Sequence, residues 1–100
     1  MRKRMRLEWS AHALADRIAI FDYIEADSPR ASVAVDIRIR EQVETLARFP
    51  QSGRQGRIQG TRELVISRTP YIVAYRIIGS TVRVLRVLHG SRRWPDEMSD

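Results

Sequence analysis

The side chains best suited to chemistry lie near the end of the chain, where His89, Arg92 and Arg93 follow an apolar segment. Such a trio can serve RNA cleavage, because arginines stabilise a pentavalent phosphate and a histidine can move the proton. Glu63 is the only acid among nine arginines between residues 54 and 94, and it is a candidate general base. The first hypothesis for this region is therefore a ribonuclease site.

The same side chains have two other uses. The trio can grip a phosphate or a carboxylate without any reaction. It can also be structural, with its arginines paired to Asp96 or Glu97 and with Trp94 packed onto the core. Glu63 can likewise be an ion-pair partner for arginines on its own strand. The residues alone leave catalysis, binding and structure open.

The overall composition limits the possible partners. The net charge is +6, and the basic residues concentrate in the second half of the chain, which favours a nucleic acid or an acidic protein as partner. There is no cysteine, no metal-ligand spacing, no phosphate-binding glycine loop and no serine triad, so we expect no metal and no cofactor. No apolar run approaches the roughly 20 residues of a membrane span, and the basic start lacks the apolar stretch of a secretory signal. We expect a cytoplasmic protein.

The second half predicts a meander of three strands, over residues 64–66, 71–78 and 82–88. Thr69-Pro70 and Gly79-Ser80 punctuate them, and connections this short require antiparallel neighbours. Alternation predicts that Val82, Val84, Arg86 and Leu88 share one face of the last strand. Since the other face also carries apolar residues, we expect this strand to be covered on both faces for part of its length.

The first half predicts a short strand over residues 4–9 and two helices, over 11–26 and 29–48. Ser10 and Ser28 are the N-caps, and a proline follows Ser28 at the first helical position. Each helix carries one apolar stripe, which we expect to face the sheet. The stripes are Leu14, Ile18, Phe21 and Ile24 in the first helix, and Val35, Ile39, Val43 and Leu46 in the second.

The order strand, helix, helix, strand, strand, strand predicts one α+β domain over residues 1–100, an antiparallel sheet with the helical hairpin packed on one face. Residues 51–60 read as an irregular polar loop.

Several segments are informative in combination: Leu7–Ala11, Phe49–Pro50, Gly53–Arg54, Arg62–Leu64, Tyr71–Arg76, and Arg86–His89 with Arg92. Together with the order of elements, they resemble the RelE/ParE superfamily of bacterial type II toxins. The resemblance implies a small toxin that inhibits growth and is neutralised by a cognate antitoxin, a DNA-binding protein encoded by the adjacent gene. It leaves open a homodimer or a toxin–antitoxin heterotetramer.

The superfamily divides by target. RelE-type members, which cut mRNA on the ribosome, carry an arginine on the middle strand, basic residues on the strand before it and an arginine just past the last strand. Here Ile72 stands at the first place, Glu63 and Val65 stand at the second, and only Arg92 matches. Losing one preorganised donor costs about 10²–10³ in rate. The resemblance is therefore closer to ParE-type members, which bind DNA gyrase without catalysis and serve plasmid stabilization.

Three hypotheses follow from the resemblance. The leading one is a ParE-like gyrase inhibitor whose target-binding residues are Arg62, Arg76, Arg86, His89, Arg92, Arg93 and Trp94. The alternative is a RelE-like mRNA interferase, in which His89, Arg92 and Glu63 are catalytic. The third is an adaptor that only binds its antitoxin. In every version we expect an antitoxin groove along the helical hairpin and the sheet edge, with contacts from Ile18, Phe21, Val35 and Ile39.

Overall fold

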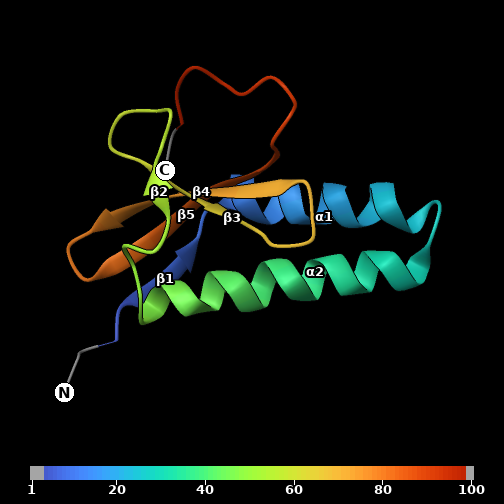
Figure 1. Ribbon diagram of the computed structural model, residues 1–100, viewed down its shortest axis with the longest axis horizontal. Coiled ribbons are helices and arrows are strands. Elements are labelled where there is room, and N and C mark those ends of the chain that lie inside the picture. Colours follow the sequence, from blue (N-terminus) through green and yellow to red (C-terminus); the bar gives the residue numbers. More distant parts are fainter. Residues whose placement is uncertain (1–3, 99–100) are drawn as a thin grey trace.

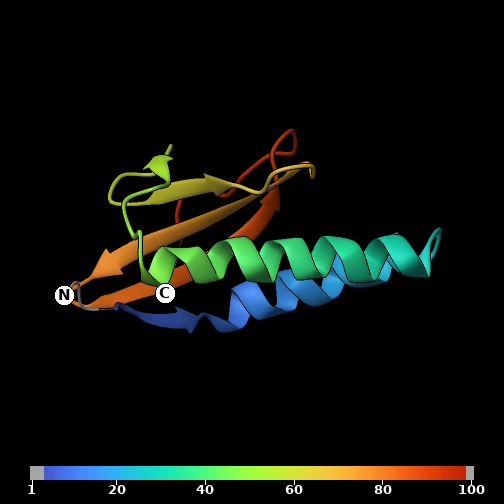
Figure 2. The same ribbon diagram turned by 60° about the horizontal axis from the view of Figure 1, so that its bottom comes forward.

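A helical hairpin lies against one face of a five-stranded sheet (Figures 1 and 2). The computed structural model describes residues 4–98, so both ends of the predicted 1–100 domain lie outside the described residues. The elements are β1 (Arg6–Trp9), α1 (Ala11–Glu25), α2 (Pro29–Glu44), the 3₁₀ turn η1 (Thr45–Ala47), β2 (Arg54–Gln55), β3 (Arg62–Val65), β4 (Tyr71–Ile78) and β5 (Thr81–His89).

The sheet has the strand order β1-β5-β4-β3-β2. The predicted α+β class and the antiparallel meander are confirmed. The sheet is nevertheless mixed, because β1 pairs with β5 in parallel. The chain passes through two helices and three strands before it returns beside β1, and so long a crossover permits the parallel orientation. The loop predicted to be irregular contains the short strand β2, which pairs with β3.

Both helices begin where their caps predict. The Ser10 hydroxyl accepts a hydrogen bond from the Ala13 N–H at 3.0 Å, and the Ser28 hydroxyl accepts one from the Ala31 N–H at 3.2 Å. These bonds satisfy amides that have no partner within the helix. At its other end, α2 stops at Glu44 and tightens into η1.

The two helices use their apolar residues differently. The predicted stripe of α2 is in the core, and Ile39, Val43 and Leu46 are fully buried. The prediction for α1 was wrong, because Leu14 is 44% exposed and Ile18 is 63% exposed. Ile24 of the predicted stripe does pack on the core, and Ala13 and Ile20 join it in place of Leu14 and Ile18. Because α1 is apolar on two sides, its sequence pattern does not decide which side turns inward.

A bulge changes which residues of β5 share a face. Ala74 of β4 pairs with Arg86, but the next residue of β4, Tyr75, pairs with Val84, so Leu85 is an extra residue. The predicted alternation therefore holds only before the bulge. Beyond it, Val87 rather than Arg86 lies on the side of Val84, facing the helices, and Val84 and Val87 both belong to the core.

Residues of α1 complete the edge of β5 beyond the end of β1. The Ser10 hydroxyl donates to the Leu85 carbonyl at 2.8 Å, and the Val87 N–H donates to Asp16 Oδ2 at 2.9 Å. Arg86 donates to the same carboxylate through Nε at 2.7 Å and through Nη2 at 3.0 Å. This bond to Asp16 raises the pKa of Arg86, although burial opposes the shift. Asp16 therefore fixes α1 to the sheet.

We expect Asp16→Asn to lower the free energy of unfolding by about 1.5 kcal/mol, because a charge-assisted bond to a partly buried guanidinium is lost. The measurement is urea unfolding followed by circular dichroism. Asp22→Asn, on the exposed side of the same helix, is the matched control. Equal urea midpoints for the two variants would contradict this role of Asp16.

Candidate functional site

A cleft of about 360 Å³ lies between α1 and the end of β5. The predicted trio lines it: His89 ends β5, and the exposed Arg92 and Arg93 follow on the C-terminal segment. Tyr23 of α1 and Tyr71 of β4 form the aromatic part of the lining. The Arg92 guanidinium lies 6.0 Å from the Tyr23 ring centre. The cleft thus combines cations with aromatic rings, which suits an anionic group on an otherwise apolar partner.

The Nδ1 atom of His89 is engaged by Ser91. The Ser91 N–H donates to His89 Nδ1 at 3.2 Å, so in the neutral imidazole the proton lies on Nε2. The ring also meets Tyr71 edge-on, with centres 5.7 Å apart. Burial raises the pKa of Tyr71, as does Tyr23, while Arg92 opposes the shift. At neutral pH the phenol is therefore protonated, and both rings present hydrogen-bond donors.

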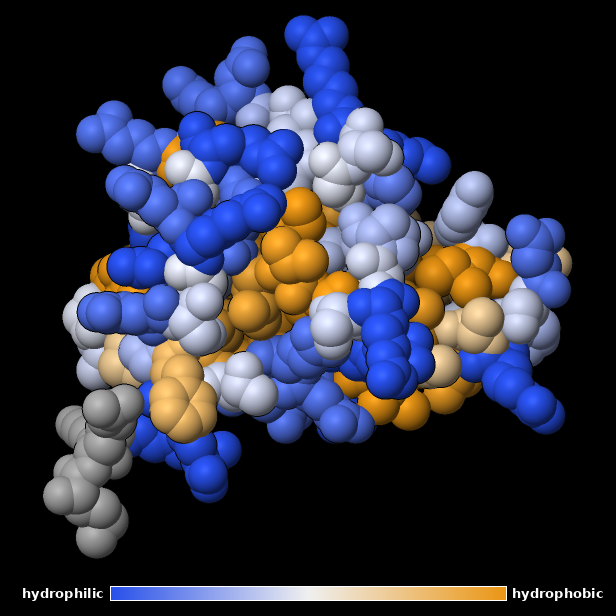
Figure 3. All heavy atoms as spheres, in the orientation of Figure 1, coloured by the Kyte–Doolittle hydropathy of each residue, from blue (hydrophilic) through white to orange (hydrophobic). Residues whose placement is uncertain are grey.

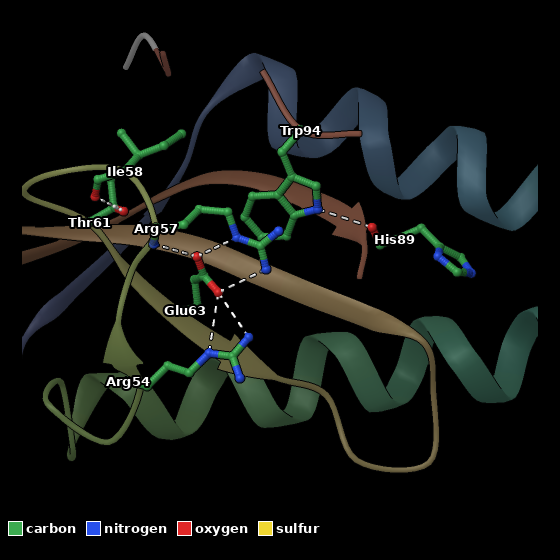
Figure 4. A network of polar contacts seen from close by, with 7 residues as sticks. All are labelled: Arg54, Arg57, Ile58, Thr61, Glu63, His89 and Trp94. Atoms are coloured by element: carbon green, nitrogen blue, oxygen red, sulfur yellow. Dashed lines mark hydrogen bonds and ion pairs between the residues drawn. The ribbon is translucent and has the colours of Figure 1, made fainter. Parts of the chain in front are cut away.

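Glu63 does not reach this cleft but lies at the centre of a closed ion-pair network (Figure 4). Its side chain is only 3% exposed and accepts five hydrogen bonds, two from Arg54 and three from Arg57. Burial raises the pKa of Glu63, but the hydrogen bonds from Arg57 and Arg54 outweigh burial and leave the pKa lowered. A carboxylate held in this way is a poor proton acceptor.

Trp94 joins this network to the C-terminal segment. The Arg57 guanidinium stacks 3.6 Å above the Trp94 ring, and Trp94 Nε1 donates to the His89 carbonyl at 3.1 Å (Figure 4). The segment that carries Arg92 and Arg93 is therefore anchored on both sides of the two arginines. It also covers part of the sheet face opposite the helices, which agrees with the burial of β5 on both faces.

The other predicted target-binding arginines are not at the cleft. Arg86 is paired with Asp16, and Arg62 donates to the Gly53 carbonyl at 2.8 Å on the side of the sheet that faces the helices. Arg76 lies beside Arg83 on the opposite face. The structure thus brings together only part of the predicted set, because strand alternation and the bulge separate the rest.

A second groove, of about 400 Å³, lies on the outer side of the helical hairpin. Ile18 and Phe21 line it, as does the ion pair between Arg17 and Asp36 at 2.9 Å. Val35 is half-buried against the core. Ile39, the remaining predicted antitoxin contact, is fully buried and is not accessible to a partner in this conformation.

Sequence reasoning missed the partners that build these sites. Arg54 and Arg57 were assigned to a loop, and nothing in the sequence pairs them with Glu63. Asp16 and Tyr23 were overlooked because they lie outside the predicted stripe of their helix. The one signal in the sequence was that Glu63 is the only acidic residue between residues 54 and 94.

Neither a metal site nor a membrane-spanning helix is found within residues 4–98. No group of three or more His, Asp or Glu side chains there could hold a metal ion. None of the helices in the same range is both long enough and apolar enough to cross a membrane.

Two solved structures with this fold come from toxin–antitoxin systems. The chromosomal ParDE system from P. aeruginosa contains a chain that aligns with a TM-score of 0.76 and 30% identity, covering 86% of this chain and 96% of that one. The toxin–antitoxin complex RelBE2 from Mycobacterium tuberculosis aligns with a TM-score of 0.58 and 26% identity, covering 86% and 98%. The fold and the sequence similarity define the class as the type II toxins of the RelE/ParE superfamily, which confirms the predicted resemblance.

The sequence similarity is more specific than the fold. The family described as "ParE toxin of type II toxin-antitoxin system, parDE" matches residues 7–94, and the chain belongs to this family. A protein of Sinorhizobium fredii named "Putative toxin Y4kP" is 46% identical over 92% of this chain and 95% of its own length. "Toxin RelE2" of Caulobacter vibrioides is 36% identical over 84% of this chain and 93% of its own.

Proposed function

We propose that this toxin acts as a ParE-like inhibitor of DNA gyrase in the cytoplasm, by binding rather than by catalysis, and that a cognate antitoxin neutralises it. One observation carries the choice against RNA cleavage: the only acid of the meander is sequestered. Glu63 is buried beneath Arg54 and Arg57, its pKa is lowered, and it does not line the cleft that contains His89.

The middle strand supports the same choice. RelE-like cleavage is expected to need a cation where this chain has Ile72, which is 8% exposed and cannot donate to a phosphate. His89 Nδ1 already accepts a bond from Ser91, so proton abstraction through that atom would first require the bond to break. What remains exposed at this cleft is a pair of arginines beside aromatic rings, an arrangement suited to a protein interface.

The direct test is a cleaved-complex assay with purified gyrase, supercoiled DNA and the full-length toxin. Accumulation of linear DNA after denaturation of the enzyme, or loss of supercoiling, is expected. Supercoiling that is unchanged at saturating toxin would count against the proposal. Addition of the antitoxin encoded by the adjacent gene should restore gyrase activity.

The double variant Arg92→Ala/Arg93→Ala should need about tenfold more toxin for half-inhibition of gyrase, because two exposed cations leave the interface. Arg30→Ala/Arg40→Ala, on α2, changes the net charge by the same amount. Its concentration for half-inhibition of gyrase should stay within about twofold of that of the unmodified toxin. Equal losses in the two double variants would mean that only net charge matters. Melting curves establish that both variants are folded.

The second candidate function is a RelE-like mRNA interferase, favoured by the presence of His89 beside Arg92 and Arg93 in one cleft. Primer extension on mRNA from cells that express the toxin tests it. Codon-phased cuts that require translation would establish cleavage. If induction leaves growth unchanged while the antitoxin still binds, the adaptor hypothesis replaces both.

For the antitoxin, we propose the groove on the outer side of the helical hairpin, with Ile18 and Phe21 as its apolar contacts and Val35 in a minor role. Leu14 and Ile18, which are 44% and 63% exposed, both line this groove, and a contiguous exposed apolar patch of this kind is typical of an interaction site. Ile39 is excluded from this surface by its burial.

A further inference from the structure

The sheet face opposite the helices, here called the far face, carries most of the arginines of the sheet. Strand register places Ala74 and Arg76 of β4 on this face, because their neighbours Val73 and Tyr75 belong to the helix-side core. Pairing places Arg83 opposite Arg76, and Glu63 opposite Ala74. By the same register, the far face also includes Arg54 and, through β1, Arg6 and Glu8.

The acids of the far face are outnumbered. Glu63 is shared by two arginines, Arg54 and Arg57. Glu8 is also shared by two, Arg83 at 3.3 Å and Arg6 at 3.6 Å. Each carboxylate therefore leaves one positive charge uncompensated, and the guanidiniums of Arg6 and Arg54 are largely exposed.

Arg76 lies between these two groups and has no ion-pair partner among the side chains the structure describes. Its Nε is buried and makes no hydrogen bond there. A buried donor without an acceptor is unfavourable, so such an atom in a folded protein needs an explanation. A partner's anion cannot reach the buried Nε, but it can compensate the charge of this guanidinium through the Nη atoms, because the Arg76 side chain as a whole is only partly buried. In Figure 3, strongly hydrophilic side chains crowd the upper left of the molecule, over the β2 loop and the β4–β5 hairpin.

We propose that the far face binds the phosphate backbone of duplex DNA through Arg6, Arg54, Arg57, Arg76 and Arg83. The inference rests on the proposed function, because it gives the toxin a contact with the DNA that gyrase holds, separate from the contact of Arg92 and Arg93 with the enzyme. Five strands about 4.8 Å apart make the sheet about 20 Å wide, which corresponds to roughly six base pairs, and the C-terminal segment around Trp94 covers part of this width.

The chemistry of the face favours a duplex backbone over single-stranded RNA. Recognition of unpaired bases uses exposed aromatic side chains on which the bases stack. The aromatic ring nearest this face is Trp94, and Arg57 already covers it at 3.6 Å. Guanidiniums spread over several strands instead match phosphates, to which arginine donates in pairs.

Fluorescence anisotropy with the full-length toxin and a labelled 20-base-pair duplex, at several salt concentrations, tests the inference. We expect binding with a Kd of about 10⁻⁵ M near physiological salt and with a steep salt dependence. Arg76→Gln/Arg83→Gln should weaken binding about tenfold at low salt and reduce the slope of log K against log salt by about 2. Arg30→Gln/Arg40→Gln on α2, matched in charge, should change the Kd by no more than about twofold.

Three outcomes would overturn the inference: equal weakening in the two double variants, no salt-dependent binding by the unmodified toxin, or tighter binding to single-stranded RNA of the same length. The assay contains no gyrase, so its result is separate from that of the proposed function. Arg76→Gln/Arg83→Gln could lose DNA binding and still inhibit gyrase at the same concentration as the unmodified toxin. That result would refute the link to the DNA in the gyrase complex. If the double variant loses both while Arg92 and Arg93 are intact, the link is supported.

Discussion

Glu63→Gln is expected to lower the free energy of unfolding by about 2 kcal/mol, and the melting temperature by roughly 10 °C. The substitution preserves the size of the side chain but removes the charge that holds Arg54 and Arg57. Breaking a fully buried ion pair costs about 3–5 kcal/mol, and the smaller figure applies here because the two arginine side chains are 56% and 42% exposed. Thermal unfolding at pH 7 measures the effect.

The pH dependence gives this prediction a distinct signature. The pKa of Glu63 is lowered in the folded protein from its ordinary value of 4.5, so its contribution to stability is present above pH 4.5 and is lost as pH falls through the folded pKa. Glutamine does not titrate. The difference in melting temperature between the two proteins should therefore shrink below about pH 4.

Glu41→Gln, at an exposed position of α2, is the matched control and should change the melting temperature by less than about 2 °C. Two results would contradict this role of the network. One is a melting temperature of Glu63→Gln equal to that of the control, and the other is a decrease in melting temperature that stays the same in acid.

The second large effect is expected at Gly53, where alanine should lower the free energy of unfolding by about 3 kcal/mol. A Cβ at this position would lie 2.6 Å from the Tyr75 hydroxyl and 2.9 Å from the Glu63 carbonyl oxygen. Tyr75 is fully buried, and its hydroxyl accepts from the Gly53 N–H at 3.0 Å and donates to the Pro50 carbonyl at 2.7 Å. The clash therefore has no flexible group that can move away.

Gly60→Ala separates this steric effect from simple loss of glycine. Gly60 has φ +81°, but a Cβ there would meet nothing within 4 Å, so we expect a cost of about 1 kcal/mol from backbone strain alone. Urea unfolding of both variants measures the difference. Similar midpoints would show that the Tyr75 hydroxyl can shift to accommodate the methyl group.

Both large predictions concern contacts of the loop that precedes β3, and this loop also positions the surfaces that we propose for target binding. The Tyr75 hydroxyl fixes the backbone at Gly53, and β2 with Arg54 follows directly. Arg57 then joins Glu63 to Trp94, and Trp94 anchors the segment with the exposed arginines. A change at Gly53 should therefore disturb target binding as well as stability.

The family does not by itself decide the target. The same fold aligns with a chain of a ParDE system and with a chain of RelBE2, and the relatives include a toxin named RelE2. A shared fold supports different activities through different side chains. We propose that the discriminating side chains in this chain are Glu63, which is buried beneath two arginines, and Ile72, which has no hydrogen-bond donor for a phosphate.

The sequence by itself determined the features that depend on neighbours along the chain. Ser10 and Ser28 start the helices because a hydroxyl satisfies amides two or three residues away. Short turns made β3, β4 and β5 antiparallel, and the bounds of β4, Tyr71–Ile78, agree with its apolar run. The inward stripe of α2 was also readable, because charged residues such as Arg40, Glu41 and Glu44 occupy much of its exposed side.

Only the tertiary structure decided the features that depend on contacts between distant residues. Leu85 is an extra residue in β5 because of the pairing with β4, and the bulge turns Val87 rather than Arg86 toward the helices. α1 has two apolar sides, and packing chose Ala13, Ile20 and Ile24. From the sequence, Glu63 was a candidate general base. Its partners, Arg54 and Arg57, belong to a segment predicted as a loop, and only the contact of this segment with Tyr75 places them beside Glu63. The periodicity of a sequence shows which residues share a face of their own helix or strand. Which face is buried, and against which other element, depends on packing across the whole fold.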